Sequence, residues 1–437
     1  MHIPQPPPPP SFFGIEVHLK KYWDLLDSRQ TDPYLPWDKQ RRRPSPPGLS
    51  PEEYWQILRL NRRAQARPIP ALTSNDGIPF SFVLTDQILR DVEDIAARTK
   101  GEIRSPLDGV SSTVRDQYVI SGLIEEAITS SQLEGAVTTR AIAKDMLRTR
   151  RKPHDKSEQM ILNNYIAMQR IRELTDEELT PELVCELQRI VTESTLDDPL
   201  RSGVVQQESD QRVSVVTYDG LTLHTPPPAR ELPERLEALC AFANNQGDGP
   251  YLPGVLRAIT VHFMMGYNHF FVDGNGRTAR ALFYWTMLHE GYWLAEFLTI
   301  STILKSAPAQ YGRSFLDTEQ DEGDLTYFFL YHLGVIKRAI DGLYGYIERK
   351  NAEARAAQEL LRSTRLTHRQ LGIMNEALTH PNARFTVKEC AQTYAVTLQT
   401  ARKDLQELVE LGYLIERREG RQAVWSAHPN LRDKIRD

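Results

Sequence analysis

The most constraining feature of the sequence is a run of twelve residues, His269–Arg280, which reads HFFVDGNGRTAR. Apolar stretches with helical periodicity lie on both sides, at 254–268 and 278–288, and we expect both to form buried helices. One histidine, one aspartate, one asparagine, two arginines and two glycines therefore converge between two core helices. Because burying so many polar groups costs stability, the run indicates a functional loop rather than a simple connection.

The glycines and arginines of this run suit a phosphate-binding loop. Gly274 and Gly276 allow a sharp turn and let a ligand approach the peptide N–H groups closely. The loop leads into a helix N-terminus, where free donors and the positive end of the helix dipole favour anions. Arg277 and Arg280 are three residues apart, so both side chains reach one face of that helix and can contact neighbouring phosphates.

The other polar residues of the run suit a metal ion and a proton transfer. Asp273 offers hard anionic oxygens for a Mg²⁺ ion that bridges phosphate oxygens. Asn275 can donate a hydrogen bond to another phosphate oxygen, and His269 has a pKa range suited to a general base at neutral pH. Together these residues predict a site that holds a metal–polyphosphate and deprotonates an attacking hydroxyl.

Two alternatives compete with this interpretation. Each residue by itself fits a Gly-Asn-Gly interhelical turn with a capping aspartate, surface arginines and a hydrogen-bonded histidine, but their combination within twelve positions disfavours that explanation. A Walker A loop also binds phosphate, but the sequence has no GxxxxGK[ST] motif and indicates no parallel sheet.

The run resembles the signature HPFx[DE]GNGRxxR of the Fic family and matches it everywhere except at the proline, which is Phe270 here. The resemblance covers roughly residues 100 to 345. It implies a helical bundle and an enzyme that transfers AMP from ATP to a Tyr, Thr or Ser hydroxyl of a protein, with Mg²⁺ as cofactor. The roles that it implies are a base for His269, a Mg²⁺ ligand for Asp273, an anion hole for the α- and β-phosphates at Gly274, Asn275, Gly276 and Arg277, a γ-phosphate contact for Arg280 and a core anchor for Phe271.

A short β-type segment precedes the run. Residues Val213–Tyr218 and Leu221–His224 flank the turn dipeptide Asp219-Gly220, a combination that predicts a hairpin. Because the surrounding pattern is helical, we expect a surface flap rather than a core sheet. The hairpin resembles the flap of the Fic family, which aligns the target segment by strand addition.

A second motif, SSQLEG at Ser130–Gly135, ends a predicted helix over 117–132. By itself it is an ordinary helix end, with Gly135 as the stop. Beside the Fic-like run it resembles the family's inhibitory motif [ST]xxxE[GN]. The resemblance implies that Glu134 pairs with Arg280 and takes the place of the γ-phosphate, since a carboxylate accepts the same forked hydrogen bonds. We therefore expect the resting enzyme to be largely inhibited.

The whole chain predicts an all-α protein: a Fic-type helical bundle with a β-hairpin flap, plus a C-terminal winged-helix domain. Ser50, Pro51 and Glu53 predict a capped helix start, and helical periodicity recurs at 86–97, 156–173, 181–191 and 232–244. Proline clusters at 6–10 and 44–47 predict an extended or turn-rich N-terminal tail. We place the domains at 1–95, 96–346 and 347–437, with a linker helix over 347–363.

The C-terminal part differs in charge: residues 351–437 carry 14 Lys and Arg against 11 Asp and Glu, in a chain of net charge −5. Predicted helices at 366–378, 386–394 and 398–411 and a hairpin at 413–425 resemble a winged helix. If it binds DNA, the groove-facing residues would be Gln399, Thr400, Arg402 and Lys403, and the wing residues Arg417, Arg418 and Arg421. Because Asp404, Glu407 and Glu410 dilute that face, DNA binding and a protein-docking or dimerising role both stay open.

Composition and residue spacing exclude several other classes of protein. The three cysteines, Cys185, Cys240 and Cys390, are far apart and fit neither a disulfide framework nor a metal-ligand motif. No apolar stretch is long enough to cross a membrane and no signal peptide is evident, so we expect a cytoplasmic protein without membrane partners. The mild negative charge excludes a polycation that coats nucleic acid.

The sequence thus predicts an autoinhibited, Mg²⁺- and ATP-dependent protein adenylyltransferase. Two alternatives stay open: a DNA-binding regulator whose Fic core senses nucleotide, and a Fic enzyme that transfers another nucleotide or phosphate, or removes AMP. The target, which can be the chain itself, and the formation of a homodimer are not determined by the sequence. Tyr284, one turn past Arg280, is a candidate for the adenine pocket.

Overall fold

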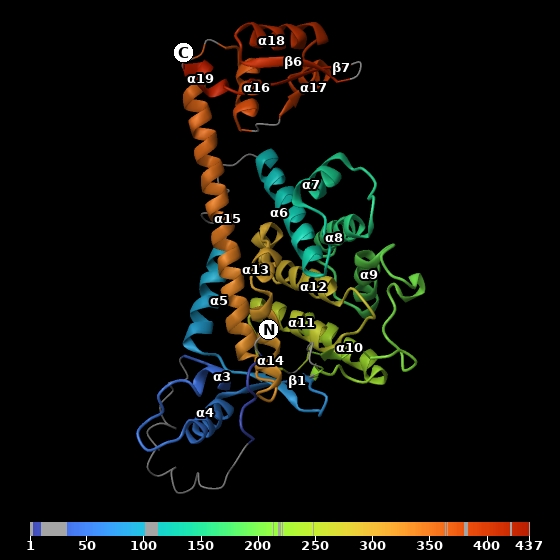
Figure 1. The fold of residues 1–437 in the computed structure, drawn as a ribbon, viewed down its shortest axis with the longest axis vertical. Coiled ribbons are helices and arrows are strands. Elements are labelled where there is room, and N and C mark those ends of the chain that lie inside the picture. The colour runs from blue at the N-terminus through green and yellow to red at the C-terminus, as the bar shows by residue number, and fades with distance from the viewer. Residues whose placement is uncertain are drawn as a thin grey trace. The chain divides into compact units, whose positions relative to one another are not determined.

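In the computed structural model the described residues are 3–9, 33–100, 112–212, 214–216, 220, 222–247, 249–362, 364, 366–379, 383–419 and 422–436. They form two compact units, Met1–Asp341 and Gly342–Asp437, hereafter unit 1 and unit 2. Helices dominate both (Figure 1), which confirms the predicted all-α class. Among the described residues, no helix combines the length and apolar character that a membrane span requires.

Unit 1 contains most of the helices and two small hairpins. Its elements are α3 (Trp37–Gln40), α4 (Pro51–Gln65), β1 (Arg67–Thr73), β2 (Pro79–Phe82), α5 (Asp86–Thr99), α6 (Ser112–Leu133), α7 (Arg140–Thr149), α8 (Lys156–Glu173), α9 (Pro181–Thr192), η1 (Pro199–Arg201), β3 (Val215–Val216), β4 (Thr222–His224), η2 (Ala229–Glu231), α10 (Leu232–Ala243), α11 (Gly254–Asn268), α12 (Asn275–His289), η3 (Trp293–Phe297), α13 (Ile300–Ser306), α14 (Pro308–Glu319) and the first part of α15 (Thr326–Leu361). The helices predicted in this unit are present, and α8 and α11 have the predicted bounds.

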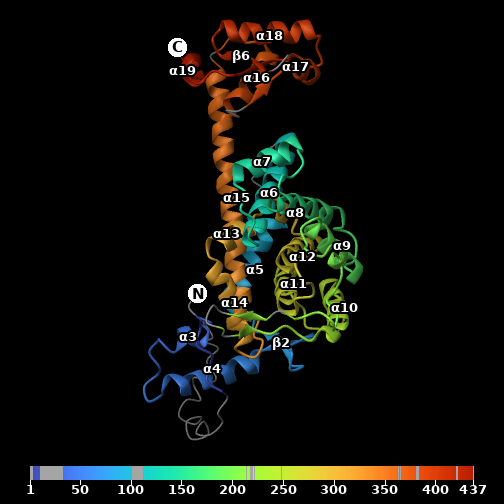
Figure 2. The same ribbon diagram turned by 45° about the vertical axis from the view of Figure 1, so that its right-hand side comes forward.

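Two helices form the centre of unit 1. Every residue of α11 except Gly266 is buried, and α12 is buried along nearly its whole length. A helix that is enclosed on all sides belongs in a core. The two helices lie side by side, with α6, α8, α9 and α10 packed around them (Figures 1 and 2). The loop that joins α11 to α12 therefore starts and ends in the core, as its flanking apolar stretches predict.

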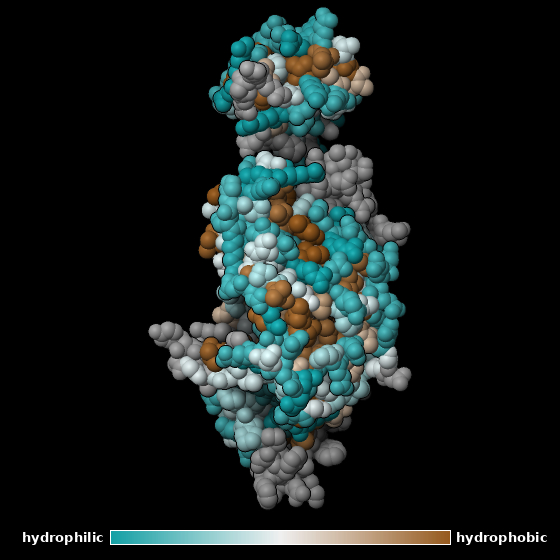
Figure 3. All heavy atoms as spheres, turned by 90° about the vertical axis from the view of Figure 1, so that its right-hand side faces the viewer, coloured by the Kyte–Doolittle hydropathy of each residue, from teal (hydrophilic) through white to brown (hydrophobic). Residues whose placement is uncertain are grey.

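The face of unit 1 that carries α8, α9 and α10 is hydrophilic over most of its area (Figure 3). Hydrophobic residues gather on this face in separate patches across the middle rather than in one continuous surface. Patches of this size and spacing do not by themselves define an interface.

The hairpin of β1 and β2 was not expected from the sequence. Its strands contain Pro68, Pro70 and Pro79, and proline normally disfavours a strand because it cannot donate to the ladder. A two-stranded ribbon has only one ladder, so proline is tolerated wherever the main chain faces away from the partner strand. Gly77, with φ of 72°, closes the turn.

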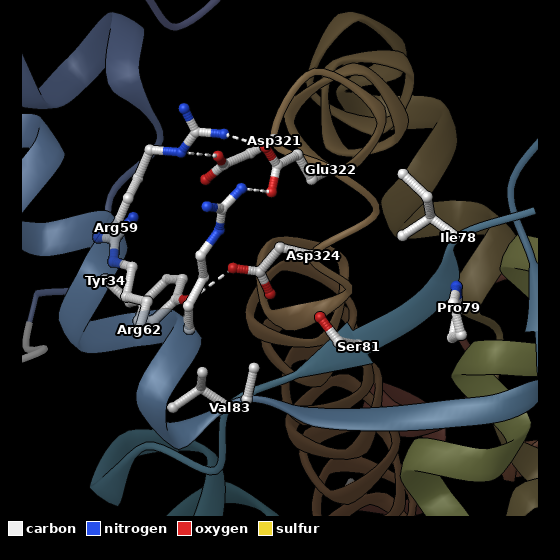
Figure 4. A pocket seen from close by; sticks show the side chains of 12 residues that line it. Tyr34, Arg59, Arg62, Ile78, Pro79, Ser81, Val83, Asp321, Glu322 and Asp324 are labelled. Carbon is white, nitrogen blue, oxygen red and sulfur yellow. Dashed lines mark hydrogen bonds and ion pairs between the residues drawn. The ribbon is translucent and has the colours of Figure 1, made fainter. Parts of the chain in front are cut away.

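The N-terminal extension is attached to the turn between α14 and α15 by an ionic cluster around a cavity of about 130 Å³ (Figure 4). Arg59 of α4 lies 3.3 Å from Asp321 and 2.7 Å from Glu322. The Tyr34 hydroxyl donates a hydrogen bond to Asp324, and burial raises the pKa of Asp324 to about 6. The extension is thus part of unit 1, and the boundary predicted at residue 95 falls inside α5.

The predicted linker helix over 347–363 requires correction. The structure has one helix of 36 residues, α15, that begins already at Thr326 and ends at Leu361. Apolar residues recur through its first half, including buried Phe328, Val335 and Ile340, and no proline separates them from the predicted segment. The division between the two units, after Asp341, lies within this helix and close to the predicted boundary at residue 347.

Unit 2 has the winged-helix architecture that the sequence predicts. After α15 come α16 (His368–Thr379), β5 (Arg384–Phe385), α17 (Val387–Thr393), α18 (Leu398–Glu410), β6 (Leu414–Glu419), β7 (Gln422–Ala427) and α19 (Leu431–Arg436). The three strands form an antiparallel sheet in the order β5-β7-β6, of which β5 was not predicted. The unit has its own core, in which Leu405 and Trp425 are buried.

Candidate active site

The loop between α11 and α12 turns through two residues in the left-handed backbone region. His269, the C-cap of α11, has φ of 49°, and Gly274, the N-cap of α12, has φ of 83°. A Cβ atom at Gly274 would lie 2.7 Å from the Thr192 side chain of α9, so glycine is required by both the backbone angle and the space. The histidine thus lies at the end of one core helix, and the glycine begins the next.

The loop is braced from within. Phe270 and Phe271 are fully buried, so Phe270 packs into the core where the signature has proline. The Asn275 side chain accepts a hydrogen bond from Phe271 N (3.0 Å) and donates one to Phe271 O (2.6 Å). The side chain thus closes the loop onto itself with one of the two N–H groups of its amide, and the hydrogen bond from this amide to a phosphate stays a prediction.

Asp273 and Arg277 meet at the first turn of α12. Asp273 accepts from Gly274 N, which takes that N–H out of the predicted anion hole, and lies 3.6 Å from Arg277 Nη2. Arg277 is 1% exposed and donates to Val191 O at 2.5 Å, whereas the Asp273 side chain is 53% exposed. Burial lowers the pKa of Arg277, and the negative charge of Asp273 partly offsets that effect. The arginine is therefore fixed, and the aspartate remains accessible.

The carboxylate of Glu134, from the end of α6, lies over the start of α12. A Cβ atom added to Gly276 would collide with Glu134 Oε1, so this oxygen sits directly beside the main chain of the first helical turn. The same oxygen accepts from Arg280 Nη2 at 2.9 Å. The carboxylate thus occupies the place where a helix N-terminus and an arginine converge, which is the geometry of an anion site.

Arg280 is bonded not only to Glu134 but also to Ser130, the first residue of the SSQLEG motif. Its side chain is 2% exposed, Nε donates to Ser130 Oγ at 2.7 Å, and Nη2 donates to Ser130 O at 3.0 Å. Burial is the largest single effect and lowers the pKa of Arg280, but Glu134, Tyr311 and Glu126 together outweigh it, so the net effect raises the pKa. The predicted pairing of Glu134 with Arg280 is present, and Ser130 is a third partner.

Helix α6, which leads to Glu134, is held in place by contacts with α13 and η3. Glu126, on the buried side of α6, accepts hydrogen bonds from the main-chain N (3.1 Å) and the hydroxyl of Ser301 at the start of α13. Burial raises the pKa of Glu126. A Cβ atom at Gly122 would lie 3.0 Å from Phe297 O, so α6 packs closely against η3. These contacts hold α6 in one position and thereby set where Glu134 lies.

The environment of His269 favours its neutral form. The residue is half-buried, and burial is the main cause of its lowered pKa. Arg212 and His224 lower the pKa of His269 further through electrostatic interactions, while Glu134 opposes them. A neutral imidazole can accept a proton, so the electrostatics suit a general base.

The predicted hairpin is present as β3 and β4. Val215 pairs with His224 and Val216 with Thr222, and both valines are exposed. Val213, Tyr218, Asp219 and Leu221 of the prediction lie outside the described residues. Within the part of the chain that the structure describes, this ribbon joins no other sheet, as expected for a flap.

Tyr284 is not an adenine-pocket residue in this structure. Its side chain is fully buried, and its hydroxyl donates to Leu298 O at 3.1 Å and accepts from Ile300 N at 3.0 Å. The position one turn past Arg280 therefore faces the core, where Tyr284 holds the turn between η3 and α13.

Asp273 fits the Mg²⁺ ion that the resemblance implies. Its carboxylate is half exposed, and a single carboxylate together with phosphate and water oxygens is a normal Mg²⁺ coordination. Among the described residues, no group of three or more His, Cys, Asp or Glu side chains could hold a metal without a substrate. All three cysteines are free, with Cys240 and Cys390 buried and Cys185 half-buried.

The exposed face of α18 in unit 2 keeps two of the three acidic residues that the sequence predicts there, because Glu410 is exposed and Glu407 is half-buried and lies 3.7 Å from Lys403 Nζ. Gln399, Arg402 and Lys403 are exposed, and Thr400 is half-buried. Asp404 does not dilute this face, because it is buried and pairs with Arg369 at 2.7 Å. Arg417 and Arg418 of β6 are exposed, and Arg421 lies outside the described residues.

The fold and the site define a helical domain with a glycine-rich, anion-binding type of loop at its centre, followed by a winged helix. Residues 178–287 match the Fic/DOC family, and residues 380–427 match the DeoR-like helix-turn-helix domain. The chain therefore carries a Fic/DOC domain and a DeoR-like helix-turn-helix domain. Fic domains are generally nucleotidyl- or phosphate-transferring domains.

One solved structure of a Fic family protein has a similar fold. A Fic family protein from Desulfovibrio desulfuricans is 15% identical with a TM-score of 0.50, and the match covers 80% of this chain and 98% of that one. A Fic domain-containing signaling protein from Bacteroides thetaiotaomicron is 20% identical with a TM-score of 0.48, over 59% of this chain and 97% of that one. No curated protein matches the chain.

Sequence reasoning missed several residues that hold the site in place. Gln188 of α9 is fully buried and donates to Asp273 O at 3.0 Å. Arg212 and His224, on either side of the hairpin, contact the end of α11. These residues are far from the motif in sequence, and single polar residues at such distances carry no periodic or spacing signal that could have revealed them.

Proposed function

We propose that the protein is an adenylyltransferase that transfers AMP from ATP to a Tyr, Thr or Ser hydroxyl of a protein, and that Glu134 inhibits it. One observation carries the proposal: a carboxylate lies where the first turn of α12 meets Arg280, which is 2% exposed. Such a place suits an anion, and in the active state we assign it to the γ-phosphate of ATP.

In the proposed reaction the target hydroxyl oxygen bonds to the α-phosphorus, and the bond from that phosphorus to the oxygen bridging to the β-phosphate breaks. AMP remains on the target and pyrophosphate leaves. His269 takes the hydroxyl proton, and its lowered pKa keeps it neutral and able to do so. The N–H groups of Asn275 and Gly276 and the Arg277 guanidinium would stabilise the phosphate charge. Mg²⁺ held by Asp273 would supply further charge neutralisation.

The test compares transfer of labelled AMP from ATP and Mg²⁺ by the wild type and Glu134→Gly. Removal of the carboxylate should raise the rate at least about tenfold, because Arg280 then becomes free for phosphate. Glu125→Gln is the matched control, since it removes a carboxylate of the same helix that pairs with Arg140 and Lys144 instead. Equal rates for wild type and Glu134→Gly would remove the inhibitory role.

Two further measurements address the chemistry. In the Glu134→Gly background, His269→Ala should abolish transfer, and full activity would contradict the assignment of the base. Mass spectrometry of the purified Glu134→Gly protein after incubation with ATP should detect one added AMP moiety. Addition of another nucleotide or of phosphate, or removal of AMP from a modified protein, would instead support the other chemistries that the motif allows.

We propose DNA binding by unit 2 as a second function. It is supported by the DeoR-like domain and by the exposed Gln399, Arg402 and Lys403 near the start of α18. In a mobility-shift assay at two salt concentrations, Arg402→Ala with Lys403→Ala should weaken binding about tenfold or more and reduce the salt dependence. The matched control, Arg432→Ala with Lys434→Ala, removes the same charge from α19, and an equal loss would contradict a specific face.

A further inference from the structure

The chain before the hairpin is bonded to the end of α11 through Arg212. Its guanidinium donates to Asn268 O at 2.6 Å and to His269 O at 2.8 Å. It also donates to Pro227 O at 2.9 Å, beyond the far strand of the hairpin, and to Gln206 Oε1 at 2.5 Å. One side chain thus connects both ends of the hairpin with the main chain of His269.

The far strand of the hairpin makes a parallel contact through His224. Its Nε2 lies 2.8 Å from Tyr267 O, and its Nδ1 lies 2.6 Å from Glu319 Oε2. A carbonyl only accepts, so Nε2 carries a hydrogen, and a second hydrogen must lie between Nδ1 and the carboxylate. His224 is buried, so these two bonds fix its ring.

Together with Gln206 N, which donates to Phe270 O at 2.8 Å, these side chains satisfy the four successive carbonyls 267–270. Helix C-terminal carbonyls have no partners within the helix, and cations are favourable there. Gln206, Arg212 and His224 therefore bond the last two carbonyls of α11 and the two that follow them, where the backbone turns left-handed at His269.

We propose that Arg212 is a positioning residue for His269. Arg212 fixes the direction of the imidazole and aligns it with the hairpin, and His224 is the second residue that bonds the hairpin to the end of α11. The inference rests on the proposed function. The planar guanidinium suits this role because its fork reaches several carbonyls at once, which an ammonium group does with less directional control. A base that is displaced by about 1 Å loses about 100-fold in rate, while nucleotide binding, made by other groups, is retained.

The test uses the full chain in the Glu134→Gly background. Arg212→Met should lower kcat for AMP transfer between about 10- and 100-fold and change the KM for ATP less than about twofold. Arg212→Lys should recover part of the loss. The matched control is Arg235→Met, because Arg235 also donates to two carbonyls, Thr73 O (2.7 Å) and Ser74 O (3.0 Å), away from the loop. Arg235→Met should leave kcat unchanged.

A second readout does not depend on activity. In NMR spectra, the His269 imidazole signals are identified by their loss in His269→Ala. They should titrate at higher pH in Arg212→Met than in the parent. The reason is that one of the charges that face His269 is removed, while His224 and Glu134 remain. Arg235→Met should show no shift. Unchanged kcat and unchanged titration in Arg212→Met would overturn the inference, as would equal losses in the two arginine variants. If the Glu134→Gly parent transfers no AMP, the proposed function fails, and the titration alone decides whether Arg212 controls His269.

Discussion

The two arginines of the loop are equally buried but differ in the kind of partner that each has. Arg277 is bonded to the Val191 carbonyl, a neutral main-chain group at the end of α9, and lies 3.6 Å from the Asp273 carboxylate of its own loop. Arg280 is bonded to the Glu134 carboxylate, which another anion can replace in kind. We therefore infer that Arg277 shapes the site permanently, whereas Arg280 changes partners during the reaction cycle.

The pKa of His269 leads to a prediction on pH dependence. Burial and the charge of Arg212 lower this pKa below the ordinary value of 6.5, so the neutral base persists as the pH falls and is lost only when the pH passes the lowered pKa. The kcat/KM of Glu134→Gly for AMP transfer should consequently have its acid limb below pH 6.5. Rates measured from pH 4.5 to 8, with ATP affinity measured in parallel, test this, and an acid limb at or above pH 6.5 would contradict it.

The Asn275 amide allows structural and functional effects to be separated. Asn275→Ala leaves Phe271 N and O without partners and should lower the free energy of unfolding by about 1–3 kcal/mol and abolish AMP transfer. Asn244→Ala is a matched control, because Asn244 makes the same pair of bonds to Leu179 N (2.7 Å) and Leu179 O (2.8 Å). It should cost similar stability and spare activity. Equal activities in the two variants would show that the loop tolerates the loss of its brace.

At the scale of elements, the sequence was informative where a local pattern repeats or a motif is compact. The bounds of α8 and α11 follow from periodicity, and the loop and Glu134 follow from short motifs. The proline-containing hairpin of β1 and β2 and the early start of α15 were missed, because the first contradicts strand propensity and the second has no punctuating residue. The bonds of Asn275 to Phe271 were also missed, because spacing does not reveal which hydrogen bonds a loop makes with itself.

The anchoring of α6 gives a prediction for the inhibitory helix as an element. Glu126→Ala removes both hydrogen bonds to Ser301, so α6 should be held less firmly and Glu134 should leave Arg280 more often. Basal AMP transfer should rise severalfold in the chain that retains Glu134 and stay unchanged in the Glu134→Gly background. Comparison of the two backgrounds measures this coupling. A similar rise of AMP transfer in both backgrounds would mean that Glu126 does not act through the position of α6.

For the molecule as a whole, the two units bury separate cores. The core of unit 2 contains residues only from 357 to 435, and the core around α11 and α12 belongs to unit 1. The residues of the proposed transfer site belong to elements of unit 1, and the exposed Arg402 and Lys403 of α18 belong to unit 2. Each activity should therefore depend on the stability of its own unit.

This division gives a reciprocal prediction for two core variants. Leu405→Ala, at a fully buried position of unit 2, should destabilise that unit by about 2–5 kcal/mol and lower its melting temperature, while AMP transfer by the Glu134→Gly chain stays unchanged at temperatures where unit 1 is folded. Ile259→Ala, fully buried in α11, should do the opposite and weaken transfer while DNA binding persists. Calorimetry with both activity assays on the full chain measures the effects. If Leu405→Ala lowers AMP transfer as much as Ile259→Ala does, the folding of unit 2 is coupled to the active site, and the two units do not act as separate folding units.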